Sequence, residues 1–290
     1  DLHSFPTRRS SDLAILFSLS LVACSHRDDS FTVEVLNAYT PVKNQGKSNL
    51  CWAYAMLSTI ETEHIMKGDS VELSVAWVAR MMERDSLAPY KKRGVALTLI
   101  REIERYGLVP HYAMRTAEDI PPRFAFLLGA QYTPLEFAHS VCAPDEYIGI
   151  GSDDAYEPFP YYTFNSPDNW HGAKLLNLPA DSLLAVTERA IRQHHGVCWE
   201  GDISERGFDW QQGVARPSLI SGFTTDDHCM AIVGIAHDAD GQPYFVMKNS
   251  WGTSNARGGL LYMSFDYFRS KTLAVVLPRV CLNVAKQHKK

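Results

Sequence analysis

Long apolar runs, basic blocks and closely paired cysteines are all scarce in this chain of 290 residues. The longest apolar run, residues 13–23, is too short to cross a bilayer as a stable helix. The formal net charge is -5 and no basic block stands out, so the sequence does not suggest a nucleic-acid partner. Without repeats or low-complexity tracts, the composition is that of an ordinary globular protein with one large domain or two lobes.

The N-terminal segment is a candidate targeting signal. Residues 13–23 (LAILFSLSLVA) fit the apolar core of a signal peptide, and Cys24 follows directly, as in a bacterial lipobox. We therefore predict a signal peptide over residues 1–23, acylation of Cys24, and a polar tether over residues 24–37. This predicts a lipoprotein of the bacterial cell envelope, on the outer membrane or the periplasmic face; the alternative is an ordinary secretory signal with a chance cysteine. Residues 1–12 resemble translated sequencing adapter and carry no inference.

The longest helical pattern lies in residues 45–68 (QGKSNLCWAYAMLSTIETEHIMKG). No proline or glycine follows Cys51 until Gly68, and apolar residues face nearly every side, which indicates a helix buried in the protein. Ser48 and Asn49 are candidate caps, so Cys51 should lie in the first helical turn. There the helix dipole favours the thiolate, which makes Cys51 a candidate nucleophile. A buried structural cysteine is the alternative reading of this stretch alone.

The remaining pattern changes from helical to strand-rich along the chain. We predict helices over residues 73–84, 93–106, 134–138 and 183–194, and strands over 230–236, 244–248, 260–264 and 273–277. The fold class is therefore α+β. The Asp-Gly at 240–241 favours a hairpin turn over a calcium loop.

The other cysteines give no metal or disulfide pattern. Cys142, Cys198, Cys229 and Cys281 have no close paired spacing, and the sequence leaves open which of them, if any, form disulfides. His194 and His195 near Cys198 could suggest a metal, but no second ligand cluster is visible, which favours a polar helix end. We expect neither a metal nor an organic cofactor.

A cysteine nucleophile needs a base, a group that orients the base, and donors for the oxyanion. His228 begins the strand-rich half and is the candidate base. Asn249 ends the next strand and can fix the imidazole tautomer, while Trp251 can shield that bond from water. Gln45, six residues before Cys51, can join the Cys51 backbone amide in an oxyanion hole.

These residues, in this order, resemble the papain-like cysteine peptidases. Gln45-Gly46, Cys51-Trp52, His228 and the NSWG at 249–252 match that family's motifs, and 177 residues (228 − 51) separate Cys51 from His228. Residues 93–110, 133–137, 177–179, 197–202 and 258–268 resemble the bleomycin hydrolase and aminopeptidase C branch. The resemblance covers about residues 38–278.

The resemblance implies a two-lobe fold with the active site in the cleft between the lobes. We expect a peptidase domain over residues 38–290, with a helical lobe at about 45–160 and an antiparallel β-barrel-like lobe at about 161–280. It also implies a cysteine peptidase that acts on peptides or proteins, and aminopeptidase action is one mode that the resemblance allows. The alternative is an inactive peptidase-like lipoprotein that serves as a binding or adhesion module. Exo- or endopeptidase action and oligomeric state stay open.

Overall fold

The computed structural model describes residues 30–86, 88, 93–217 and 224–286. Its helices are α1 (Cys51–Met66), α2 (Val75–Met82), α3 (Ala96–Tyr106), α4 (Pro134–Val141), α5 (Ala180–Arg192) and α6 (Phe265–Lys271), with two 3-10 turns at His111–Ala113 and Arg279–Lys286. Its strands are β1 (Phe31–Leu36), β2 (Ala125–Leu127), β3 (Ala130–Tyr132), β4 (Tyr147–Gly151), β5 (Tyr161–Thr163), β6 (Lys174–Asn177), β7 (Val197–Gly201), β8 (Phe208–Asp209), β9 (Val214–Ala215), β10 (His228–Asp238), β11 (Pro243–Lys248), β12 (Leu260–Ser264) and β13 (Thr272–Pro278).

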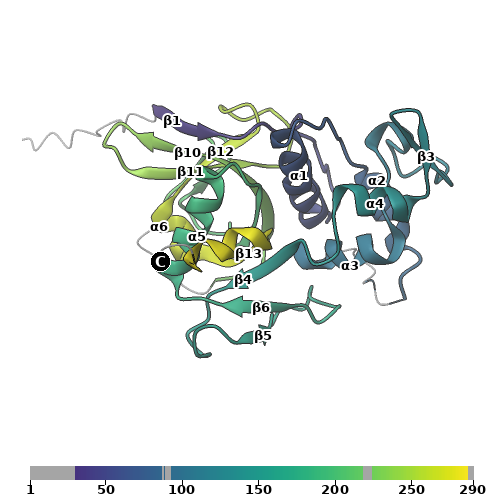
Figure 1. Ribbon diagram of the computed structural model, residues 1–290. Helices are drawn as coiled ribbons and strands as arrows, with labels where there is room; N and C mark the ends of the chain where they lie inside the picture. The colour runs from purple at the N-terminus through teal and green to yellow at the C-terminus, as the bar shows by residue number, and fades with distance from the viewer. Residues whose placement is uncertain (1–29, 87, 89–92, 218–223, 287–290) are drawn as a thin grey trace, which may run out of the picture.

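The molecule has a helical part and a sheet part, and α1 stands between them (Figure 1). Helices α2, α3 and α4 lie on one side of α1, with the small β2–β3 hairpin beyond them. The large sheet lies on the other side, and α5 and α6 pack against it. This confirms the predicted α+β, two-part fold.

The large sheet has eleven strands in the order β5-β6-β4-β13-β7-β10-β11-β12-β9-β8, with β1 also paired to β10. Most pairs are antiparallel, but β4–β6 and β9–β12 are parallel. Among the described residues the two end strands do not pair with each other, so the sheet is not a closed barrel. The long strand β10 pairs with β11 along one edge; along the other edge its residues 228–232 pair with β7 and its residues 234–238 pair with β1.

Alternation along β7 and β10 divides the core into two layers. Cys198 and Cys229 belong to the core shared with α1 and the other helices. Trp199 and Met230, one position further along each strand, belong to the core covered by α5 and α6. Successive side chains of a strand point to opposite faces. The sheet is therefore buried on both sides in the middle, and its α1 face is where the two parts meet.

Most predicted helices and strands are present, with ends shifted by a few residues. The Ser74 side chain caps α2 by accepting from the Trp77 amide, and α3 ends at Gly107, which has φ of 75°. The predicted caps of α1 are wrong. The residue before its first turn is Leu50, without a side-chain cap bond, and Ser48 and Asn49 lie one or two residues too early.

The predicted tether over residues 24–37 is wrong for its second half. Residues 31–36 form β1, which pairs with the far end of β10. Phe31, Val33 and Val35 alternate with their neighbours, as in a strand, but the polar residues around them made this pattern hard to recognise. Strand β4 likewise lies in the large sheet, although it precedes residue 161. The predicted signal peptide and Cys24 lie outside the described residues.

Candidate active site

Cys51 is the first residue of α1 and opens onto a cleft between the two parts of the molecule. The cleft has a volume of about 150 Å³, and Gln45, His228 and Trp251 line it together with Cys51. The first amides of a helix have no acceptor within the helix and carry its positive dipole end. The fold therefore places the cysteine where negative charge on sulfur is favoured.

His228, at the start of β10, is held by Asn249 at the end of β11. The His228 Nε2 to Asn249 Oδ1 distance is 2.7 Å, and the Ser250 amide donates to the same oxygen at 2.7 Å. A backbone N–H can only donate, so the atom it meets must be the amide oxygen. That oxygen can only accept, so His228 Nε2 carries a hydrogen. The other ring nitrogen, Nδ1, is left to face Cys51.

An aromatic group covers the bond between His228 and Asn249. The Trp251 ring lies 4.6 Å from the His228 ring, centroid to centroid, and tilted by 36°. Trp210 packs edge-on against Trp251 at 5.2 Å, and Phe208 does so at 6.2 Å. Both His228 and Asn249 are buried. Water is thereby kept from competing for their hydrogen bond, which strengthens it.

The surroundings of Cys51 favour its thiolate. A hydrogen bond from the Cys229 side chain holds the pKa of the Cys51 thiol well below its ordinary value, and hydrogen bonding and positive charge from His228 act in the same direction. These effects outweigh burial, which alone would raise the pKa of Cys51. A thiol next to an imidazolium at a helix N-terminus is a reactive nucleophile.

Gln45 lies beside Cys51, with its side chain fixed from two sides. Its Oε1 accepts from the Ser250 hydroxyl at 2.6 Å, and its Nε2 donates to the Ser48 carbonyl at 2.8 Å. Its backbone amide also donates to the Ser250 carbonyl at 2.7 Å. An amide nitrogen has two hydrogens, so one donor is left in addition to the bond to Ser48.

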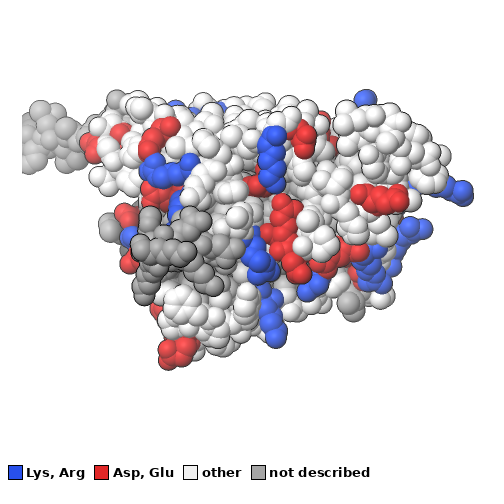
Figure 2. Space-filling view, in the orientation of Figure 1, with Lys and Arg blue, Asp and Glu red and all other residues white. Residues whose placement is uncertain are grey.

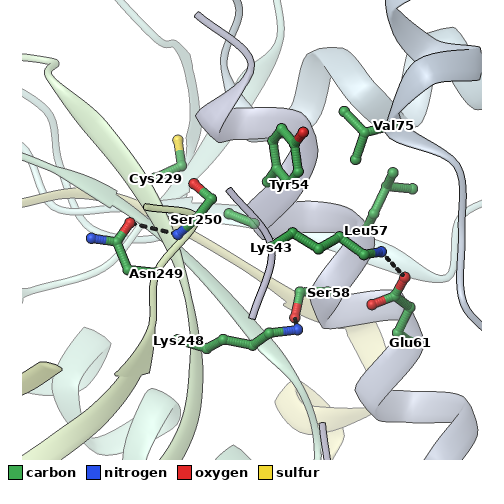
Figure 3. A pocket seen from close by; sticks show the side chains of 11 residues that line it. Lys43, Tyr54, Leu57, Ser58, Glu61, Val75, Cys229, Lys248, Asn249 and Ser250 are labelled. Atoms are coloured by element: carbon green, nitrogen blue, oxygen red, sulfur yellow. Dashed lines mark hydrogen bonds and ion pairs between the residues drawn. The ribbon is translucent and has the colours of Figure 1, made fainter. Parts of the chain in front are cut away.

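A largely buried network of hydrogen bonds and ion pairs joins the end of β11 to α1 (Figure 3). Lys248, directly before Asn249, donates to Ser58 of α1 at 2.9 Å and to Thr40 at 2.8 Å. Glu61, nearly three turns after Cys51 in α1 and 1 % exposed, accepts from Thr40, from the Leu73 amide at 2.7 Å and from Lys43 at 3.2 Å. The network fixes the end of β11 against α1, and hence Asn249 relative to Cys51.

Acidic groups form part of the cleft lining, which we call its acidic end. Asp168, Asp226 and Asp227 line it together with Arg93, whose Nε donates to Asp168 at 2.6 Å. Burial and the neighbouring Asp226 raise the pKa of Glu200 well above its ordinary value. Among the lining residues themselves, three carboxyl groups stand against one guanidinium. No sequence pattern indicates this end of the cleft, because its residues come from four separate segments.

The histidines near Cys198 have protein partners. His194 bonds Asn37, and His195 pairs with the buried Glu63 at 3.2 Å. Hydrogen bonds with Cys281 and Glu63 raise the pKa of His195 to about 10, so it carries a charge at neutral pH. The polar helix end that we predicted describes this region. Elsewhere, Asp85, Glu102 and His171 gather in one buried cluster, where Arg105 pairs with Asp85 at 2.7 Å.

Two further features of the described residues are the distribution of surface charge and the length of the helices. Figure 2 shows acidic and basic side chains interspersed on one face of the molecule, without a large basic area there. In residues 30–286, as far as the structure describes them, no helix has the length and apolar character to cross a membrane.

The chain is similar in sequence to known cysteine peptidases and aminopeptidases. Residues 204–289, which include His228 and Asn249, match the model of the Peptidase C1-like family. Aminopeptidase E of Lactobacillus helveticus is 25% identical over 170 residues, covering 50% of this chain and 39% of that protein. The viral cathepsin of Spodoptera litura multicapsid nucleopolyhedrovirus is 26% identical over 245 residues, covering 84% and 57%. The chain thus spans about half the length of the curated relatives it matches.

Solved structures show the same fold. The structure of PepW from Lactobacillus rhamnosis HN001 superposes with a TM-score of 0.69 at 18% identity, covering 86% of this chain and 82% of that one. The proform of the Amb a 11 cysteine protease, a ragweed pollen allergen, superposes with a TM-score of 0.55, covering 87% and 66%. The fold is therefore papain-like, as the motif order Gln45, Cys51, His228 and Asn249 implied.

Proposed function

Starting from this relationship to the papain-like cysteine peptidases, we propose that the chain is a cysteine peptidase with Cys51 as nucleophile. The Cys51 thiolate attacks the carbonyl carbon of a peptide bond. The Cys51 amide and the second Nε2 hydrogen of Gln45 donate to the oxyanion. His228 gives its proton to the leaving amine, and water, activated by His228, then hydrolyses the thioester.

The observation that carries this proposal is the fixed state of His228. The Ser250 amide orients the Asn249 oxygen, which requires the hydrogen of His228 on Nε2. Nδ1 is then available to hold and release the Cys51 proton. The hydrogen bond between Cys51 and His228, and the lowered pKa of the Cys51 thiol, fit a nucleophile and base that already exist as an ion pair.

The acidic end of the cleft supports aminopeptidase action as the finer proposal. A substrate whose amino terminus remains free carries an ammonium group, and Asp168, Asp226 and Asp227 offer carboxylates for it near Cys51. Similarity to aminopeptidase E points the same way, while similarity to a viral cathepsin keeps endopeptidase action as the second candidate.

A peptide library with free and with blocked amino termini tests both levels of this proposal. We expect cleavage that Cys51→Ala abolishes, and a preference of at least about tenfold in kcat/KM for free amino termini. Equal rates on free and blocked peptides would favour the endopeptidase.

No cleavage, together with no reaction of Cys51 with an epoxide probe at mildly acidic pH, would favour the inactive binding module instead. Cys142 is the internal control in the probe experiment, because burial raises the pKa of its thiol to about 12. It should stay unlabelled under conditions in which Cys51 reacts.

We also propose that the protein is anchored by lipid at Cys24 in the bacterial cell envelope. The support is the apolar run at residues 13–23 with the cysteine directly after it. Expression in a bacterium, with mass spectrometry of the mature N-terminus, tests this. A diacylated Cys24 supports the proposal, whereas an unmodified Cys24 within an intact or differently cleaved N-terminus overturns it.

A further inference from the structure

A second thiol lines the same cleft as the candidate nucleophile. Cys229 directly follows His228 in β10, and it lines the same cleft as Cys51. Hydrogen bonding from its side chain and its backbone lowers the pKa of the Cys51 thiol. Both cysteines are free thiols in this structure. The mechanism proposed above uses His228, Asn249 and Gln45, and it assigns no step to Cys229.

The strand geometry explains why Cys229 faces the nucleophile. Alternation along β10 puts Cys229 in the core shared with α1, opposite to its neighbour Met230, which packs under α5 and α6. Cys229 also lines the small buried space below the cleft with Tyr54 and Ala55, from the first turn of α1 (Figure 3). The α1 face of β10 thus presents the Cys229 thiol to the helix end that carries Cys51.

The two thiols differ in exposure and in ionisation. Cys51 is partly exposed in the cleft, whereas Cys229 is only 3 % exposed. Burial, and the hydrogen bond with Cys51, raise the pKa of the Cys229 thiol well above its ordinary value. An exposed thiolate next to a protected thiol is the arrangement found where one cysteine is oxidised first and a second one resolves the product.

We propose that Cys51 and Cys229 form a reversible disulfide when a peroxide oxidises the site, and that this bond switches the enzyme off. The effect on activity rests on the function proposed above; formation of the bond does not. The disulfide would remove the nucleophile and protect it from irreversible oxidation to the sulfinic acid.

The chemistry takes two steps. The Cys51 thiolate attacks one oxygen of hydrogen peroxide, the O–O bond breaks, and the departing hydroxide takes the proton held by His228 to become water. Cys51 is then a sulfenic acid, oxidised by two electrons. The Cys229 sulfur attacks the Cys51 sulfur, the S–O bond breaks, and the hydroxyl leaves as water with the Cys229 proton. One peroxide and two thiols thus give one disulfide and two waters.

Mass spectrometry of the whole protein after mild peroxide treatment tests the bond without any substrate. We expect a loss of about 2 Da, a peptide linking Cys51 to Cys229 after digestion under non-reducing conditions, and full reversal by dithiothreitol. Peptide hydrolysis should fall and recover in parallel. If the bond forms and reverses but no peptide is ever cleaved, the proposed function fails while this inference stands.

Two variants locate the bond. Cys229→Ser should show no disulfide, and its Cys51 should gain about 32 Da as a sulfinic acid that dithiothreitol does not reverse. Cys198→Ser is the matched control, because Cys198 is equally buried and lies on the neighbouring strand β7, in the same core. It should behave like the wild type.

Three results would overturn the inference. One is direct conversion of wild-type Cys51 to the sulfinic acid, without a disulfide. Another is a disulfide that links Cys51 to Cys198. The third is equal recovery by dithiothreitol in the wild type and Cys229→Ser. Should Cys229→Ser fail to fold by circular dichroism, Cys229→Ala provides the same test without a buried hydroxyl.

Discussion

The two ends of α1 differ in how their polar groups are satisfied. At its first turn, Cys51 opens to a cleft, and its neighbours stabilise a reactive thiolate. Further along, the buried carboxylates of Glu61 and Glu63 are each matched by a cation and by a backbone amide. One helix thus carries the reactive cysteine at its start and stabilising charge pairs further along. Paired charges fix the helix against the sheet, so that the reactive turn is held in place without being closed off.

Removing the Cys51 thiol should have the largest effect on activity and little effect on stability. Cys51→Ala should lower kcat/KM for peptide hydrolysis by roughly 10³-fold or more, because the nucleophile is gone. The thermal midpoint should stay within about 2 °C of the wild type, because the ion pairs further along α1 are untouched. Hydrolysis assays and calorimetry on the same preparation measure both. A large drop in the midpoint would mean that Cys51 has a structural role.

Removing a paired charge further along α1 should lower stability. Glu61→Gln removes the buried charge that accepts from Thr40 and Lys43, although Lys43 keeps its pair with Glu72, and should lower the free energy of unfolding by about 3 kcal/mol, measured by urea denaturation. Glu188→Gln is the matched control, because its pair with Arg192 is exposed and should matter by less than about 1 kcal/mol. In the folded fraction, the pH dependence of Cys51 alkylation should not change.

Removing the group that orients the His228 imidazole should reduce activity less than removing Cys51. Asn249→Ala removes the acceptor that holds the Nε2 hydrogen of His228 and should reduce kcat by roughly 10²-fold, less than the loss in Cys51→Ala. Asn249→Asp restores an oxygen at the same place and should recover part of the rate with a shifted pH profile. A loss in Asn249→Ala as large as that in Cys51→Ala would contradict an orienting role.

The smallest expected effect is the pH dependence of stability that comes from Lys248, which bonds Ser58 of α1. Burial lowers the pKa of Lys248 to about 8, from 10.5 for the free side chain. Between these values the unfolded chain binds more protons than the folded one, so stability from this group rises with pH. Relative to Lys248→Met, the wild type should gain on the order of 1–3 kcal/mol in unfolding free energy from pH 8 to 10. A pH-independent difference would show that Lys248 does not titrate in this range.

Much of the framework could be predicted because it depends on local pattern. The helix that begins at Cys51, the strands that begin at His228 and end before Asn249, and the hairpin at Asp240-Gly241 follow from periodicity and turn residues. Strand β1 was missed because polar neighbours surround its three alternating apolar residues. Helix α6 was missed because it is short and follows β12 without a break.

The sequence by itself determined which residue types could act as nucleophile, base and orienting group, and in which order they occur. Only the tertiary structure decided that Gln45 is held by Ser48 and Ser250, and that Cys229 lines the same cleft as Cys51. The same holds for the acidic end of the cleft. The reason is physical: periodicity reports the backbone hydrogen bonds and burial of a single segment. A contact between residues more than a hundred positions apart depends on how the finished sheet and helices pack.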